Sequence, residues 1–177
     1  MEARTLTTLV AEVLDRAWRR DSTLHGEHHW RCVSGTALAL AARTPGADAA
    51  ICLCFGLLHD TRRENDSHDP EHGPRAAELA RALADDGLLA LGSTRTDLLL
   101  ETIALHADGR VSDDPTTGTC WDADRLHLPR VGIAPRPSLL SSVEGRRPDA
   151  VDAAAVLRAQ PPSWAALVRL AAADARP

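Results

Sequence analysis

Apolar residues recur at intervals of three and four along most of this chain, and that spacing is the period of an amphipathic helix. In the N-terminal segment Leu6, Leu9 and Val13 lie on one stripe, which predicts a helix over about 3–19. Proline, glycine and capping residues mark the ends of the later stripes. They predict further helices over about 27–42, from 48 through the apolar run ICLCFGLL, and over about 69–85, 94–106, 120–128, 149–158 and 163–173.

Capping residues indicate where two of these helices begin. Asp69 precedes Pro70, and a carboxylate at the N-cap followed by proline at the first helical position is typical of a helix start. Thr94 and Asp97 have the spacing of a capping box. We therefore expect Asp69 and Thr94 to accept hydrogen bonds from free backbone N–H groups of the helix that follows each.

Composition favours an all-α fold. Alanine and leucine dominate, and aromatic residues make up only 3% of the chain, so strand-forming residue types are scarce. A length of 177 residues is typical of one domain with its own hydrophobic core. We therefore expect a single all-α domain over 1–177, with a proline-rich C-terminal extension over about 132–177.

Charge and cysteine content exclude several classes of protein. The net charge of −5 disfavours a general nucleic-acid or membrane-surface binder, because such proteins present a basic face to phosphates. The longest apolar run is far shorter than the roughly 20 residues needed to cross a bilayer, and the N-terminus has no secretory apolar region. The four cysteines show no C-x-x-C spacing and are expected to be reduced packing residues. These features predict a cytoplasmic protein with no membrane partner.

Several histidines and an aspartate continue the apolar faces of the predicted helices, and these residues are the candidates for a functional site. Burying an imidazole or a carboxylate without a partner costs several kcal/mol, so groups of this kind need a common partner. A single such histidine is more often a hydrogen-bonded core residue, but five positions and an adjacent His-Asp pair favour a metal ion. Nitrogen and oxygen ligands together suit iron, manganese, cobalt, nickel or zinc. The five positions are His29, His59, His72, His106 and Asp124, and Asp60 completes the pair with His59.

Five segments, in chain order, carry a resemblance to a known family. HGEHHWRCV, LLHDTRREND, DPEHGPRAAELA, IALHADG and CWDADRLHL resemble the successive motifs of the HD-domain superfamily of metal-dependent phosphohydrolases, in particular its small single-domain bacterial members. The resemblance covers about residues 22–133 and implies an HD-domain-like helical bundle.

The resemblance also implies a set of metal ligands. The family's core pattern of a histidine, a His-Asp pair and a distant aspartate matches His29, His59, Asp60 and Asp124. Members with two metals carry additional histidines between the pair and the final aspartate, and His72 and His106 occupy those intervals. The resemblance thus implies one or two divalent transition-metal ions. In the two-metal form Asp60 bridges them.

The chain departs from the family pattern at two places. Cys32 stands where many relatives carry an arginine, which removes any electrostatic role of that residue. A second His-Asp pair, His68 and Asp69, has polar, turn-forming flanks. We expect His68 at the rim of the site and Asp69 mainly in helix capping.

Residues next to the ligands have two interpretations each. His25 either contacts substrate as a proton donor or makes an ordinary hydrogen bond. Arg62 or Arg63 either clamps a phosphoryl group or interacts with the dipole at the end of the preceding helix. Asp122 is an alternative ligand to Asp124, and the family match to ADRL favours Asp124 with Asp122 beside it.

The remaining histidines and tryptophans are expected outside the chemistry. His28 and His127 are predicted to face solvent. Trp30 and Trp121 are predicted to be core residues rather than platforms on which a base stacks.

The leading interpretation is a phosphohydrolase in which metal-activated water attacks phosphorus. His25, Arg62 and Asp60 are its candidate catalytic residues, and its substrate is a small phosphorylated molecule, with nucleotides among the candidates. Two alternatives remain open: a non-catalytic metal-binding sensory or interaction domain, and a di-iron oxygenase of the same superfamily. No oligomeric state follows from the sequence.

Overall fold

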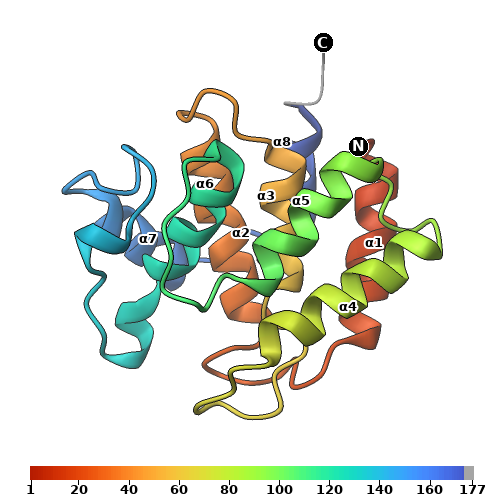
Figure 1. The fold of residues 1–177 in the computed structure, drawn as a ribbon, viewed down its shortest axis with the longest axis horizontal. Coiled ribbons are helices and arrows are strands. Elements are labelled where there is room, and N and C mark those ends of the chain that lie inside the picture. Colours follow the sequence, from red (N-terminus) through yellow and green to blue (C-terminus); the bar gives the residue numbers. More distant parts are fainter. Residues whose placement is uncertain (174–177) are drawn as a thin grey trace.

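The computed structural model describes residues 1–173, and that part of the chain is helical, with no strand (Figure 1). This confirms the all-α prediction. The last four residues of the predicted C-terminal extension lie outside the described residues. The α-helices are α1 (Ala3–Arg16), α2 (Glu27–Ala41), α3 (Ala49–Leu58), α4 (His72–Asp85), α5 (Ser93–Ala104), α6 (Pro115–Arg125), α7 (Ala150–Ala159) and α8 (Trp164–Ala173), with short 3-10 helices at Leu128–Val131 and Pro137–Leu139.

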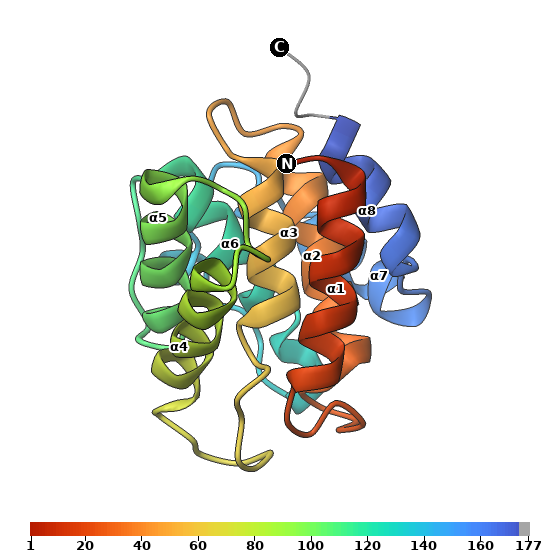
Figure 2. The same ribbon diagram turned by 90° about the vertical axis from the view of Figure 1, so that its right-hand side faces the viewer.

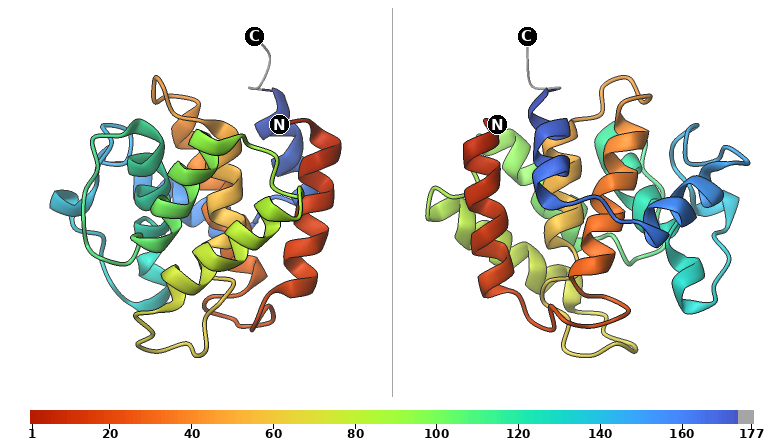
Figure 3. Two further views of the ribbon diagram at one scale, coloured as in Figure 1. Left: turned by 45° about the vertical axis from the view of Figure 1, so that its right-hand side comes forward. Right: turned by 180° about the vertical axis from the view of Figure 1, so that it is seen from behind.

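Helix α3 occupies the centre of the bundle. Figure 2 shows α1 and α8 on one side of α2 and α3, and α4 and α5 on the other, and the right-hand view of Figure 3, from behind, shows α8 between α1 and α3. Every residue of α3 is buried, as expected for a helix that is apolar all round. One hydrophobic cluster includes side chains from all eight α-helices. The other helices therefore surround the C-terminal end of α3, where His59 and Asp60 lie.

Within residues 1–173, none of the helices combines the length and the apolar character needed to span a bilayer. The four cysteines are buried and form no disulfide, which agrees with their predicted role in packing. Trp30 and Trp121 are also buried, as predicted, and the indole N–H of Trp121 donates to the carbonyl of Thr102.

Two capping predictions are wrong. Helix α4 begins at His72 rather than near Pro70, and the Asp69 carboxylate instead accepts from the guanidinium of Arg75 and from the backbone N–H of Glu64. Thr94 lies inside α5, whose N-cap position is Gly92 with no side-chain cap. A charged partner outcompetes capping at Asp69, because an arginine bonds a carboxylate more strongly than a backbone N–H does.

Helix α6 is longer than predicted. It begins at Pro115, five residues before the predicted start at 120, because the carboxylate of Asp114 accepts from the backbone N–H of Thr117 and Pro115 takes the first helical position. The helix also ends at Arg125, before the predicted end at 128, so Asp124 lies in its last turn.

Two glycines let helix pairs approach closely beside the site. A Cβ at Gly56 of α3 would lie 2.5 Å from the backbone nitrogen of Ser34 in α2. A Cβ at Gly73 of α4 would lie 2.8 Å from the carbonyl oxygen of Ala104 in α5. Real Cβ atoms are not found so close to backbone atoms, so only glycine permits these two crossings.

Asp48 fixes the start of α3. Its carboxylate accepts from the backbone N–H groups of Ala50 and Ile51 and from the guanidinium of Arg95 at 2.7 and 2.8 Å. Burial acts to raise the pKa of Asp48, but the hydrogen bonds from Arg95 and the helix N–H groups outweigh it and hold the pKa below its usual value. The backbone N–H of Asp48 also donates to the Thr116 hydroxyl, which joins α3 to α6.

We predict that Asp48→Ala lowers the free energy of unfolding by about 1–2 kcal/mol, because it removes an N-cap. Urea denaturation at pH 7 measures the loss. Asp97→Ala is the matched control, since the Asp97 side chain is exposed on α5 and its substitution should cost less than about 0.5 kcal/mol. Because the folded-state pKa of Asp48 is depressed, the difference between wild type and Asp48→Ala should shrink as the pH falls below about 4. Equal losses in the two variants would contradict this role.

Candidate metal centre

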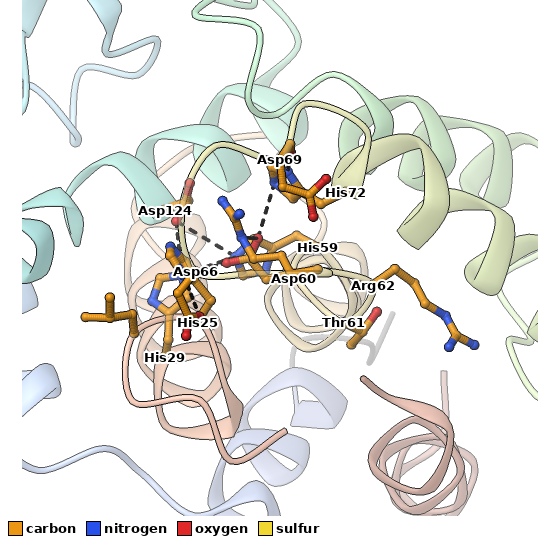
Figure 4. Close-up of polar contacts among 12 residues, drawn as sticks. His25, His29, His59, Asp60, Thr61, Arg62, Asp66, Asp69, His72 and Asp124 are labelled. Carbon is orange, nitrogen blue, oxygen red and sulfur yellow. Dashed lines mark hydrogen bonds and ion pairs between the residues drawn. The ribbon is translucent and has the colours of Figure 1, made fainter. Parts of the chain in front are cut away.

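The first ligand group joins three helices. His29 lies in the first turn of α2, His59 is the C-cap residue of α3, and Asp124 lies near the end of α6. The Nε2 atom of His29 is 3.3 Å from Nε2 of His59 and 3.2 Å from Oδ1 of Asp124. These side chains turn toward one another from separate elements (Figure 4).

The second group lies directly beside the first. It consists of Asp60, which follows His59, together with His72 at the start of α4 and His106, two residues after α5 ends. The Nε2 atoms of His72 and His106 are 2.9 Å apart, and Nε2 of His72 is 3.3 Å from Oδ1 of Asp60. Each group has three potential ligand atoms within 4.8 Å of one another.

The carboxylate of Asp60 lies between the two groups and faces each with a different oxygen. Its Oδ2 is 3.6 Å from Nε2 of His29 and 3.5 Å from Nε2 of His59. Its Oδ1 is 3.3 Å from Nε2 of His72 and 3.9 Å from Nε2 of His106. A carboxylate with this orientation can share its two oxygens between two cations, which an imidazole cannot do.

Backbone carbonyls determine which nitrogen of three histidines points into the site. The Nδ1 atoms of His59 and His106 lie 3.2 and 2.7 Å from the carbonyl oxygens of Gly56 and Ile103, and Nδ1 of His72 contacts the carbonyl of Asp69. A carbonyl only accepts, so each Nδ1 carries the proton and each Nε2 presents a lone pair. This arrangement is typical of metal-bound histidines.

Facing lone pairs repel unless a cation lies between them. Burial lowers the pKa of His72 and of His106, and lowers that of His29 to about 3, so protonation is an unfavourable way to remove the repulsion. Burial acts to raise the pKa of Asp60 and of Asp124, but the positive charge of nearby groups, including Arg63 at Asp60 and Arg130 at Asp124, outweighs it and holds both pKa values below their usual range. The cluster is therefore a set of neutral nitrogens and negative oxygens.

This donor set fits a transition-metal ion. Two ligands that each lie about 2.1 Å from one ion, at angles of about 90–110°, are about 3.0–3.4 Å apart. The spacings of 2.9 and 3.3 Å between the paired histidine nitrogens are close to that range. The Oδ1 atom of Asp124 is buried and has no hydrogen-bond partner among the described residues, as expected of an atom that binds a cation. These buried groups can hold a metal ion.

A pocket of about 500 Å³ opens over the ligands. Its floor includes Asp60, His72, His106 and Asp124. Aliphatic side chains from the segment after α6 form one wall. The pocket is also rich in positive charge, because four arginines line it: Arg63, Arg125, Arg130 and Arg136.

His25 lies at the edge of the ligand cluster and lines the pocket, as the substrate-contact interpretation requires. Its ring centroid is 6.2 Å from that of His29, and its Nδ1 is 3.2 Å from Oδ1 of Asp66. Asp66 is held in turn by the Ser22 hydroxyl at 2.6 Å and by Arg19 at 2.6 Å. The ring orientation of His25 is thus fixed by a carboxylate (Figure 4).

The two arginines after the His-Asp pair have different positions. Arg62, the predicted catalytic residue, points away from the ligands and stacks on the Trp18 ring, 4.7 Å from its centroid (Figure 4). It does not line the pocket. Arg63 does, and its Nε donates to Oδ1 of Asp60 at 3.0 Å. The structure therefore corrects the choice of Arg62 and leaves Arg63 as the arginine beside the ligands.

Asp122 and His127 are both buried, but neither belongs to a ligand group. The Asp122 carboxylate accepts from the backbone N–H groups of Ser141 and Ser142, so it fixes the chain after the pocket wall. The prediction that His127 faces solvent is wrong: its Nε2 is 2.8 Å from the Thr36 hydroxyl, and burial lowers its pKa to about 4. His127 lies four residues after Ala123, the spacing of residues on one helix face, and this spacing indicated that it could be buried. His28 and His68 are exposed.

Arg130 is the main site residue that the sequence patterns missed. Its guanidinium donates to the carbonyls of Leu24 and His127, and Nη1 lies 3.9 Å from Oδ1 of Asp124. It belongs to a 3-10 helix beyond the last predicted motif, where no period or spacing marks it. Only the folded chain brings it to the pocket.

Comparison of this chain with models of protein families, with curated protein sequences and with solved structures found no match. The chemistry of the site therefore has to be inferred from its residues and their geometry.

We predict that the purified protein binds a transition metal and that Asp60→Ala removes most of it, because Asp60 faces all four histidines. Elemental analysis after dialysis against nickel or manganese measures the content. His28→Ala is the matched control, since His28 is exposed next to His29 on α2 and should leave the content unchanged. Circular dichroism verifies that the variants remain helical. Equal metal content in wild type and in folded Asp60→Ala would rule out the assignment of Asp60.

Proposed function

We propose that this chain is a metal-dependent phosphohydrolase of the HD-domain type that cleaves small phosphate esters. The observation that carries the proposal is the shared position of Asp60, whose two oxygens face two histidine-rich ligand groups at the floor of an arginine-lined pocket. Buried histidines and carboxylates provide the ligands, and the arginines offset the negative charge of a phosphoryl group. The order of the motifs in the sequence supports the same family.

We further propose two ions rather than one. Each ligand group supplies two imidazoles and a carboxylate oxygen, and Asp60 contributes to both through different oxygens. The alternative, in which His72 and His106 contact phosphate directly, leaves their lone pairs 2.9 Å apart with no proton between them. Two imidazoles whose Nδ1 protons are held by backbone carbonyls have no N–H left for a phosphate oxygen.

In a loaded site, ions of this kind supply a bound water of lowered pKa and polarise the phosphoryl group. The chain's own residues would do the rest. Arg63, beside Asp60, neutralises charge on the phosphoryl oxygens. As water adds to phosphorus and releases one proton to solvent, the bond from phosphorus to the leaving oxygen breaks, and His25 in its protonated form gives that oxygen a proton. Asp66 holds His25 in the orientation for this transfer.

The ion number gives the first test. We predict about two nickel or manganese ions per chain in the wild type and about one in His72→Ala and in His106→Ala, because either change removes an imidazole from the second group alone. Metal titration followed by calorimetry or elemental analysis measures the stoichiometry, with His28→Ala as control. A value near one in the wild type, unchanged in both variants, would reject the two-ion proposal and leave His29, His59, Asp60 and Asp124 as the metal site.

Turnover gives the second test. We predict hydrolysis of p-nitrophenyl phosphate mono- or diesters, or of common nucleotides, with manganese, cobalt, nickel or ferrous iron, and poor turnover with magnesium alone, because imidazole suits the former ions better. Asp124→Asn should lower kcat at least about 100-fold, since it removes a charged ligand. His28→Ala should match wild type.

Other outcomes would favour the two remaining classes. No turnover with any metal, despite normal metal content, would favour a non-catalytic sensory or interaction domain. Oxygen consumption with diols or phosphonates after reconstitution with ferrous iron, without phosphate release from esters, would favour a di-iron oxygenase.

A further inference from the structure

Arg125 is a buried cation beside the pocket, and one of its hydrogen-bonding groups has no partner among the described residues. Its side chain lines the pocket but is only 7% exposed, and its guanidinium lies over Trp121, 5.5 Å from the ring centroid. Its Nη1 donates to the carbonyl of Leu139. Its Nη2 is buried without a hydrogen-bond partner among the described residues. An unpaired guanidinium nitrogen is costly to bury, so this group is suited to an anion that the pocket takes up.

No carboxylate makes an ion pair with Arg125 among the described residues. In the pocket Asp60 is held by Arg63 and Asp66 by Arg19, whereas Asp122 and Asp124 act on Arg125 only through longer-range electrostatic attraction. The other unpaired cation of the pocket is the exposed Arg136, whose guanidinium makes no ion pair or hydrogen bond within residues 1–173. The outer pocket therefore has positive charge beyond what the ligand cluster requires.

The wall between these charges is aliphatic. Leu128, Val131, Ile133 and Leu139 line the pocket, and no tryptophan or phenylalanine of the described chain does. A nucleobase is usually held by an aromatic face, which this wall lacks. Arg125 follows Asp124 in α6 and both residues line the same pocket, so one molecule in that pocket can contact the metal ligands and Arg125.

We propose that Arg125, assisted by Arg136, binds a second acidic group of the substrate, a carboxylate or a phosphate, while the first phosphoryl group lies at the metal centre. The substrate class is a phosphate ester that carries this second acid on a short aliphatic skeleton. The inference rests on the proposed function, because the metal centre defines where the first phosphoryl group binds.

Non-hydrolysable phosphonates test this by binding alone. Calorimetry on nickel-loaded protein at 150 mM salt compares propylphosphonate, which has one acidic group, with 3-phosphonopropionate and propane-1,3-diphosphonate, which have two on a similar skeleton. We predict that wild type binds at least one of the two-acid probes more than about tenfold tighter than propylphosphonate, since a charge-assisted hydrogen bond is worth about that factor. Arg125→Met should reduce this preference to about twofold or less. Arg169→Met, an exposed arginine on α8, should keep it.

Each outcome decides the inference. Equal affinities in wild type, no binding of any phosphonate, or an unchanged preference in Arg125→Met would overturn it. If Arg125→Met does not fold, Arg136→Met serves in its place, because its side chain is exposed, and its preference should fall at least about threefold. An unchanged preference there would also overturn the inference. The two probes distinguish a carboxylate from a phosphate, and ester turnover in wild type tests the proposed function separately.

Discussion

The buried carboxylate of Asp60 constrains the whole ligand cluster. Its two oxygens face four imidazoles, and one of these oxygens, Oδ1, also accepts a hydrogen bond from the guanidinium of Arg63. A buried carboxylate is tolerated only where charges and hydrogen bonds compensate it, so the neighbouring groups cannot move independently. The two ligand groups lie at the ends of different helices and are therefore joined through this one residue. A substitution of Asp60 thus affects both groups.

The apolar bundle makes this concentration of polar groups possible. Helix α3 is buried along its full length, and Asp48 and Arg95 fix its start while His59 and Asp60 follow its end. The hydrophobic burial of such a helix offsets the cost of holding charged and polar groups at its end. The close crossings at Gly56 and Gly73 then bring each pair of histidine-bearing helices to the separation that their ligands need.

The candidate ligands could be picked out from the sequence because they lie on or just beyond regular helices. His29, His72 and His106 prolong apolar stripes, so the helical period alone placed them inside, and the structure brings them together with His59, Asp60 and Asp124. Interactions between distant segments were harder to predict. Arg75, six residues away, diverted Asp69 from capping, and the ring of Trp18 holds Arg62 away from the pocket. No local pattern encodes such pairings.

The pocket wall and the pocket floor differ in secondary structure. The floor consists of residues at helix ends, whereas the wall comes from 128–139, where prolines and short 3-10 helices leave no regular spacing of apolar residues in the sequence. Asp122 fixes the far end of that segment by accepting from the N–H groups of Ser141 and Ser142, and Arg125 binds the carbonyl of Leu139. An irregular segment held at such points tolerates substitution better than a packed helix does. Most of the pocket wall is thus carried by a different part of the chain from the candidate metal ligands, and Arg125, next to Asp124 at the end of α6, lies where the two meet. A shared ligand pattern is therefore informative about the kind of site and much less so about the molecule that binds there.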